Sequence, residues 1–186
     1  MRIYLRPITL EDGSLIVKWR NNPEVLAHCL NQVPITNESN KRFFHEKIET
    51  GLYKQFIVER IEEEFGLASY PIATVYLKDI DYINKRCELC IFTSNDEEWK
   101  SDSQSIAVKM LLDIAFNEMG MHKVYSFAFY QFLNEANLLK KAGFTVETIL
   151  KNEAVNQKGE YEDIVRFSVT EDEFHNFEAT KNEQKT

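Results

Sequence analysis

A long, largely apolar helix is the feature that most limits what this chain can fold into. From Ile106 to Met119 apolar residues occur on nearly every side of the helical turn, while Lys109, Asp113 and Asn117 form one narrow polar stripe. A helix with so narrow a stripe is covered by other elements over most of its surface. Gly120 follows as the residue best able to close it in a left-handed cap. We therefore expect this helix to be mostly buried in the core.

Strands are predicted on both sides of this helix, at 87–93 and 124–129. The strands predicted at 55–61, 72–80 and 87–93 follow one another with only turns between them. This arrangement predicts an antiparallel meander of three strands. The other expected elements are strands at 3–8, 146–150 and 161–169, and helices at about 10–20, 23–30, 37–49 and 133–142. This order predicts an α/β (α+β) fold with a mixed, mostly antiparallel central sheet and flanking helices.

Length and composition predict one domain over residues 1–170, followed by a charged C-terminal tail at 171–186 that forms one helical turn and then frays. Neither a secretory signal nor a membrane-spanning apolar run is visible, so we expect a cytoplasmic protein. The formal charge of -8 opposes binding to nucleic acid or to an anionic membrane and favours encounter with a cationic substrate.

The cysteine and histidine residues do not predict a metal site. Cys87 and Cys90 form a C-x-x-C, but residues three apart on a regular strand point to opposite faces. The remaining Cys29 and the four histidines lack metal-ligand spacing. The chain also lacks the G-x-S-x-G, G-x-x-x-x-G-K and G-x-G-x-x-G motifs, so hydrolase, P-loop and dinucleotide-binding functions have no support.

Seven short motifs occur one after another along residues 2–170. They lie at 5–8 (LRPI), 18–25 (KWRNNPEV), 87–92 (CELCIF), 98–99 (EW), 111–116 (LLDIAF), 122–124 (HKV) and 141–144 (KAGF). In this order and spacing the chain resembles the GNAT (N-acetyltransferase) superfamily, and within it the Rim-type, polyamine and amino-sugar acetyltransferase branch. The resemblance implies a GNAT-like sheet in which the parallel strands at 88–93 and 124–129 splay apart.

The resemblance also implies an acyl-CoA site between these two strands. The backbone of Phe92 and Thr93 corresponds to the part that binds the pantetheine arm, and the diphosphate corresponds to the amino end of the next helix. The expected cofactor-binding residues are therefore Phe92, Thr93, Lys100, Ser101, Ser103, Gln104 and Ser105. The serines are equally well explained as helix caps.

Two positions depart from the family pattern and bear on whether acetyl-CoA still binds productively. Asp102 places a carboxylate where a glycine is expected in the diphosphate loop, and Phe132 replaces an asparagine that touches the cofactor. The family's frequent tyrosine acid corresponds to Leu139. Tyr130 or Ser126 is a candidate replacement for that acid, although an aromatic residue beside a sheet is more often part of the core.

Glu88 is the candidate catalytic base because it lies on the central strand near the implied cleft. The alternative is a structural carboxylate bonded to Arg6 or Arg20. By resemblance Trp19, Arg20 and Asn21 are the candidate substrate residues, and the alternative is that they pack the helix and end it before Pro23.

The sequence thus predicts an enzyme, a GNAT-family N-acetyltransferase that moves an acetyl group from acetyl-CoA to a primary amine of a protein N-terminus, polyamine or amino sugar. The expected partner is a small-molecule or peptide amine, with no metal, nucleic acid or membrane. A homodimer is compatible with the sequence but not required by it. The alternative is a catalytically inactive GNAT-fold binding or regulatory protein that does not bind acetyl-CoA productively.

Overall fold

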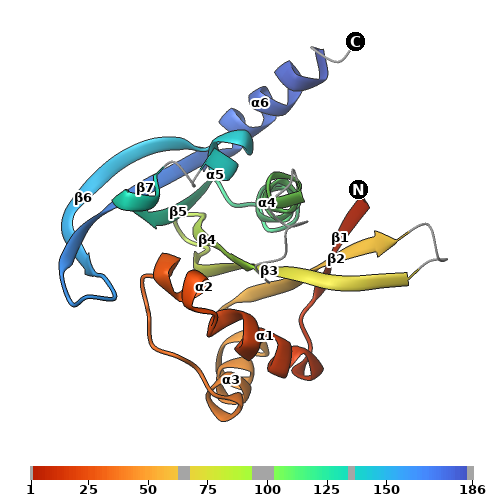
Figure 1. Ribbon diagram of the computed structural model, residues 1–186. Coiled ribbons are helices and arrows are strands. Elements are labelled where there is room, and N and C mark those ends of the chain that lie inside the picture. Colours follow the sequence, from red (N-terminus) through yellow and green to blue (C-terminus); the bar gives the residue numbers. More distant parts are fainter. Residues whose placement is uncertain (1, 63–67, 94–102, 134–136, 184–186) are drawn as a thin grey trace.

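The computed structural model describes residues 2–62, 68–93, 103–133 and 137–183. Its centre is a seven-stranded sheet with the order β1-β2-β3-β4-β5-β7-β6 (Figure 1). The strands are β1 Arg2–Pro7, β2 Lys54–Glu62, β3 Ala68–Asp81, β4 Arg86–Thr93, β5 Lys123–Phe129, β6 Thr145–Val155 and β7 Tyr161–Thr170. All neighbours pair antiparallel except β4 and β5, which are parallel. The predicted mixed, mostly antiparallel sheet and its meander β2-β3-β4 are confirmed.

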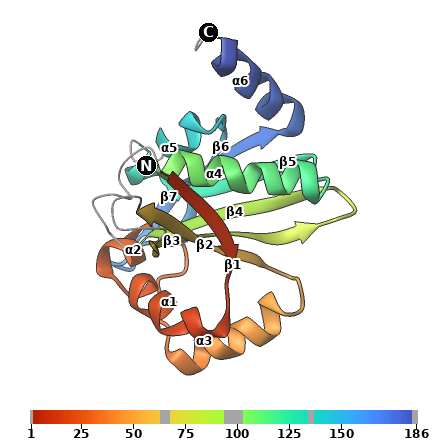
Figure 2. The ribbon, with the colours of Figure 1, turned by 90° about the vertical axis from the view of Figure 1, so that its right-hand side faces the viewer.

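Helices cover both faces of this sheet (Figure 2). They are α1 Gly13–Arg20, α2 Pro23–His28, α3 Asn37–Phe43, α4 Ser103–Asp113, α5 Asn137–Lys141 and α6 Glu171–Glu183. α4 lies on one face, while α1 and α3 lie on the other. α3 and α4 each continue in a π-helical turn, Phe44–Ile48 and Ile114–Glu118, so they reach the lengths predicted from the sequence.

The alternation of side chains along β4 divides the interior into two cores. Cys87 and Leu89 point to the α4 side and join Leu111 and Leu112 of that helix in the larger core. Phe92 points to the opposite side and joins the smaller core around Trp19 of α1. The predicted burial of the long helix is confirmed, and Gly120 closes it with the left-handed φ of 65°.

The segment after β7 forms a longer helix than the single turn expected from the sequence. α6 begins with a capping box, in which the backbone N–H of Thr170 donates to Glu173 over 2.8 Å. Phe174 is buried and packs on Phe116 of the α4 extension, with 5.5 Å between ring centroids. Lys109, from the polar stripe of the long helix, pairs with Glu178. Lys109 therefore helps to hold α6 against the long helix.

β6 extends five residues beyond the predicted end at 150 because its pairing with β7 resumes after an irregularity. The register shifts between Leu150 and Ala154, and Asn152 has a left-handed φ of 49°. This break interrupts the alternation of apolar and polar residues, which is why the pattern alone predicted a shorter strand. In the described part of the chain, no helix has the length and apolar character needed to cross a membrane.

Candidate active site

β4 and β5 separate after only three registered pairs. The pairs are Arg86 with Lys123, Cys87 with Val124, and Glu88 with Tyr125. Beyond Glu88, β4 remains paired with β3 as far as Thr93, and β5 remains paired with β7 as far as Phe129. Each strand therefore has an unpaired edge that faces the other. Such edges leave backbone N–H and C=O groups that an extended ligand can bind as an added strand.

The candidate cofactor residues border this opening where the structure describes them. Phe92 and Thr93 lie on the open segment of β4, and the side chain of Phe92 is buried in the smaller core, so it offers only its backbone. Ser103, Gln104 and Ser105 form the first turn of α4, the helix that follows β4 in the chain. A helix of this length presents free N–H groups and a positive dipole end at its start. Lys100, Ser101 and Asp102 lie outside the described residues.

Glu88 stands at the narrow end of the opening and is 5% exposed. Its Oε1 accepts from the Lys78 ammonium at 3.0 Å and from the Cys90 thiol at 3.1 Å. Within the described residues its Oε2 makes no hydrogen bond or ion pair. Neither of the arginines considered from the sequence is the partner, because Arg6 pairs with Glu59 and Asp12, and Arg20 donates to a backbone carbonyl.

The charge on Lys78 is firmly held. Burial lowers the pKa of Lys78, but the carboxylate of Glu88 beside it counteracts this, and the pKa of Lys78 is raised above its ordinary value. Burial and the nearby Glu88 raise the pKa of Cys90 far above that of a free thiol. Cys90 therefore stays protonated as a donor to Glu88, which keeps one carboxylate oxygen bound by two donors and the other available.

An aromatic wall adjoins this pair on the α1–α3 face of the sheet. Tyr76 is the register partner of Cys90 on β3, and their side chains are hydrogen bonded. Tyr53 stacks on Tyr76 with 6.1 Å between ring centroids. Cys87 lies in the larger core on the other face, where burial raises its pKa to about 12. The two cysteines of the C-x-x-C therefore point apart, as the strand period requires.

Trp19, Arg20 and Asn21 lie at the end of α1, and each has a structural contact. Trp19 is 5% exposed in the smaller core. Arg20 donates to the backbone carbonyl of Asn31, and the Asn21 side chain both accepts from the N–H and donates to the C=O of Ile35, over 2.8 and 2.7 Å. These contacts hold the loop at 29–35 against α1.

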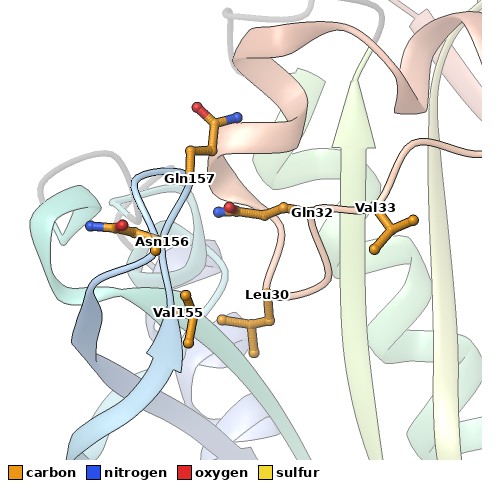
Figure 3. A pocket seen from close by; sticks show the side chains of 7 residues that line it. Leu30, Gln32, Val33, Val155, Asn156 and Gln157 are labelled. Carbon is orange, nitrogen blue, oxygen red and sulfur yellow. The ribbon is translucent and has the colours of Figure 1, made fainter.

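That loop forms one side of an open concavity of about 580 Å³ (Figure 3). The other side is the turn between β6 and β7. The lining residues are Leu30, Gln32, Val33, Val155, Asn156, Gln157 and Gly159. Carboxamide groups and aliphatic side chains thus alternate around a space that has room for a small flexible molecule.

The positions that depart from the family pattern have structural explanations. Leu139 is 5% exposed and belongs to the larger core. Phe132 packs on His28 of α2, with 3.9 Å between the ring centroids. Tyr130 is 48% exposed, whereas Ser126 on β5 is 6% exposed.

Sequence reasoning missed Lys78 and Tyr76. Their signal was the meander itself, because residues of β3 that face β4 in register are neighbours of Glu88 and Cys90. Among the described residues, no group of three or more His, Cys, Asp or Glu side chains is arranged to hold a metal ion.

Comparisons with known proteins agree with this geometry. The sequence model of the acetyltransferase (GNAT) domain matches residues 2–145. The spermidine N(1)-acetyltransferase of Escherichia coli (strain K12) is 23% identical over 172 residues, which cover 92% of this chain and 88% of the relative. An uncharacterized N-acetyltransferase, p20 of Bacillus licheniformis, is 25% identical over 179 residues, which cover 93% of this chain and 95% of the relative.

Solved structures share the fold. The spermidine N-acetyltransferase from Vibrio cholerae, in complex with CoA and spermine, superposes with a TM-score of 0.83 at 20% identity, covering 92% of this chain and 97% of the other. The family match includes β1 to β5, the opening between β4 and β5 and the helix that follows β4. The chain therefore belongs to the acetyltransferase (GNAT) domain family.

Proposed function

We propose that this enzyme transfers an acetyl group from acetyl-CoA to a primary amine of a small cationic acceptor, with a polyamine such as spermidine as the preferred class. The observation that carries the proposal is the opening between β4 and β5 with Glu88 at its narrow end. There the carboxylate keeps Oε2 available for a proton while Oε1 is held by Lys78 and Cys90.

Acetyl-CoA fits this opening as an added strand. The free backbone edge of residues 89–93 binds the pantetheine arm, and the start of α4 at Ser103 supplies N–H groups to the diphosphate. With the diphosphate at the end of β4, the extended arm runs toward Glu88. The thioester then lies at the narrow end of the opening, beside the candidate base.

The chemical step needs an uncharged amine held against the thioester carbon. Glu88 Oε2 takes a proton from the acceptor amine, the nitrogen bonds to the carbonyl carbon, and the C–S bond breaks with its electron pair on sulfur. Lys78 holds Oε1 of this carboxylate at 3.0 Å, so Oε2 is the oxygen that meets the amine. The buried position of Glu88 strengthens this ion pair by limiting screening by solvent.

Two observations support a polyamine acceptor. The chain carries a formal charge of -8, which favours the approach of a polycation. The concavity between the loop at 29–35 and the β6–β7 turn combines carboxamides with aliphatic side chains, and a polyamine combines amines with methylene segments. The relatives named above from E. coli and V. cholerae are both spermidine acetyltransferases.

The direct test is acetyl-CoA-dependent thiol release by the purified chain with spermidine, an amino sugar and a peptide with a free N-terminus. We expect spermidine to give the highest kcat/KM. Glu88→Gln should lower kcat by about 100-fold or more, since a positioned general base contributes on that order. Glu59→Gln is the matched control, because Glu59 is a buried carboxylate on β2 that pairs with Arg6 instead.

Two results would contradict the proposal. The first is a wild-type protein that releases no thiol with any amine. The second is a Glu88→Gln variant that is as active as Glu59→Gln. A preference for the peptide or the amino sugar would retain the acetyl transfer but reject the polyamine class.

A further inference from the structure

The reaction proposed above leaves a negative charge on the sulfur atom of CoA, and this charge needs a hydrogen-bond donor. When the C–S bond breaks, the thiolate is best stabilised by a hydrogen-bond donor already in place. Leu139, on α5, has no donor group and is packed in the larger core. Any donor to the sulfur must therefore come from another element that borders the opening.

Ser126 is the first residue of β5 beyond the last registered pair with β4, Glu88 with Tyr125. Its neighbour Val124 and its partner Phe167 on β7 both lie in the larger core, so the serine points to the α4–α5 side. Ser126 is 6% exposed, and no hydrogen bond of its hydroxyl group is found among the described residues, while its oxygen is not one of the fully buried unpaired atoms. A hydroxyl group that solvent still reaches, and that no neighbouring residue binds, is free to donate to a ligand.

Three tyrosine hydroxyl groups near the opening are committed or remote. Tyr125 lies on the opposite face, where the Arg166 guanidinium sits 4.3 Å from its ring centroid. Tyr76 is hydrogen bonded to Cys90. Tyr130 is 48% exposed on the turn that follows β5. Ser126 thus combines burial, an unused donor and a position at the narrow end of the opening.

We propose that the Ser126 hydroxyl donates a hydrogen bond to the thioester sulfur as that atom becomes negative. This inference rests on the proposed acetyl transfer. The new C–N bond forms, the C–S bond breaks with its pair on sulfur, and Glu88 accepts the amine proton. The serine keeps its own proton, because an aliphatic hydroxyl is a weaker acid than a thiol. The released thiolate takes a proton from water.

The test compares Ser126→Ala with the full-length wild-type protein at saturating acetyl-CoA and spermidine. We expect kcat to fall about 10-fold, the usual scale for one neutral hydrogen bond that strengthens in the transition state. The KM for spermidine and the thermal midpoint should stay close to wild type, since no hydrogen bond within the protein is lost. Ser126→Thr, which keeps a hydroxyl on a strand, should recover most of kcat.

The matched control is Ser168→Ala. Ser168 is a buried serine on β7 whose hydroxyl bonds Glu147, so its loss should lower the thermal midpoint and leave kcat unchanged. If wild type is active and Ser126→Ala keeps full kcat, the inference fails while the proposed function stands. It also fails if Ser126→Ala unfolds at lower temperature and Ser126→Thr does not recover kcat, because the role is then structural. An inactive wild-type protein overturns the proposed function and the inference with it.

Discussion

Lys78→Met removes the cation beside Glu88 while keeping most of the length of the side chain. In wild type the Lys78 nitrogen lies 3.0 Å from Glu88 Oε1, and the two side chains are 25% and 6% exposed. The variant leaves the carboxylate with the Cys90 thiol as its one remaining donor among the described residues. We therefore expect Lys78→Met to lower kcat, because the proposed base loses the cation that holds one of its oxygens.

The size of the effect on kcat follows from the geometry. Two unit charges about 4 Å apart interact with about 4 kcal/mol at an effective dielectric constant of 20. Solvent near the partly exposed lysine and relaxation around the buried carboxylate reduce this, and we take about one third to one half as the net effect. Since about 1.36 kcal/mol corresponds to a tenfold change in rate, kcat should fall about 10-fold.

The assay is kcat for spermidine acetylation at neutral pH, with Lys78→Arg to retain a cation and most of the activity. Lys123→Met is the matched control, because Lys123 is a partly exposed lysine that pairs with Glu147 instead of Glu88. The pKa of Lys78 is raised in the folded state, so its stabilising contribution is fully present below the unfolded pKa near 10.4 and declines only as the pH rises through the folded value. Equal kcat values for Lys78→Met and Lys123→Met would refute the reasoning.

Two further predictions concern Asp12 and Asp102. Burial raises the pKa of Asp12, but hydrogen bonds from Arg6 and Thr9 outweigh burial and leave the pKa lowered. The stabilisation that Asp12 gives the folded protein is therefore present above the unfolded pKa near 3.9, and it declines as the pH falls through the folded pKa. Asp12→Asn should cost about 2 kcal/mol in urea unfolding at pH 7 and much less at pH 3, and an equal cost at both would contradict this. Asp102→Gly should lower the KM for acetyl-CoA, because it removes a carboxylate from the sequence expected to meet the diphosphate, and a loss of activity would reject that interpretation of the loop.

The fold was predictable because its strongest signals are local. The apolar stretch from Ile106 to Met119 gave a buried helix, and α4 with its extension lies there. Thr9 and Asp12 have the spacing of a capping box at the start of the first helical segment, and both hydrogen bonds of that box are present. Such patterns depend on residues a few positions apart, so one sequence is enough to see them.

The environment of Glu88 was not predictable because it depends on strand register. The end of β3 contains a bulge in which Asp79 has a left-handed φ of 48°, and the register with β4 shifts there. This bulge sets the register in which Lys78 stands opposite Glu88. If β3 slipped by one residue along β4, a residue whose side chain points to the other face of the sheet would stand opposite Glu88. The sequence was therefore enough to select Glu88 as the candidate base, but it was not enough to identify Lys78 as the partner of Glu88.

The end of α1 shows a second limit of motif reasoning. The resemblance implies that Arg20 and Asn21 contact a substrate, and in the structure both side chains are bonded to the backbone of the loop at 29–35. Side chains that hold this loop shape the concavity through it. The sequence identifies such a residue as important but does not distinguish the two roles, because both need polar groups at the same helix end.

The strand period explains why the base and the proposed sulfur donor do not neutralise each other. Glu88 pairs in register with Tyr125, so the next residue of β5, Ser126, points to the opposite face of the sheet. Two polar groups that border one narrow opening on the same face would hydrogen bond to each other when no substrate is present. In the reaction we propose, the carboxylate meets an amine from the α1–α3 side, and the hydroxyl group meets sulfur from the α4–α5 side. The two proposed roles, proton removal and thiolate stabilisation, are thus kept apart by a single residue step along β5.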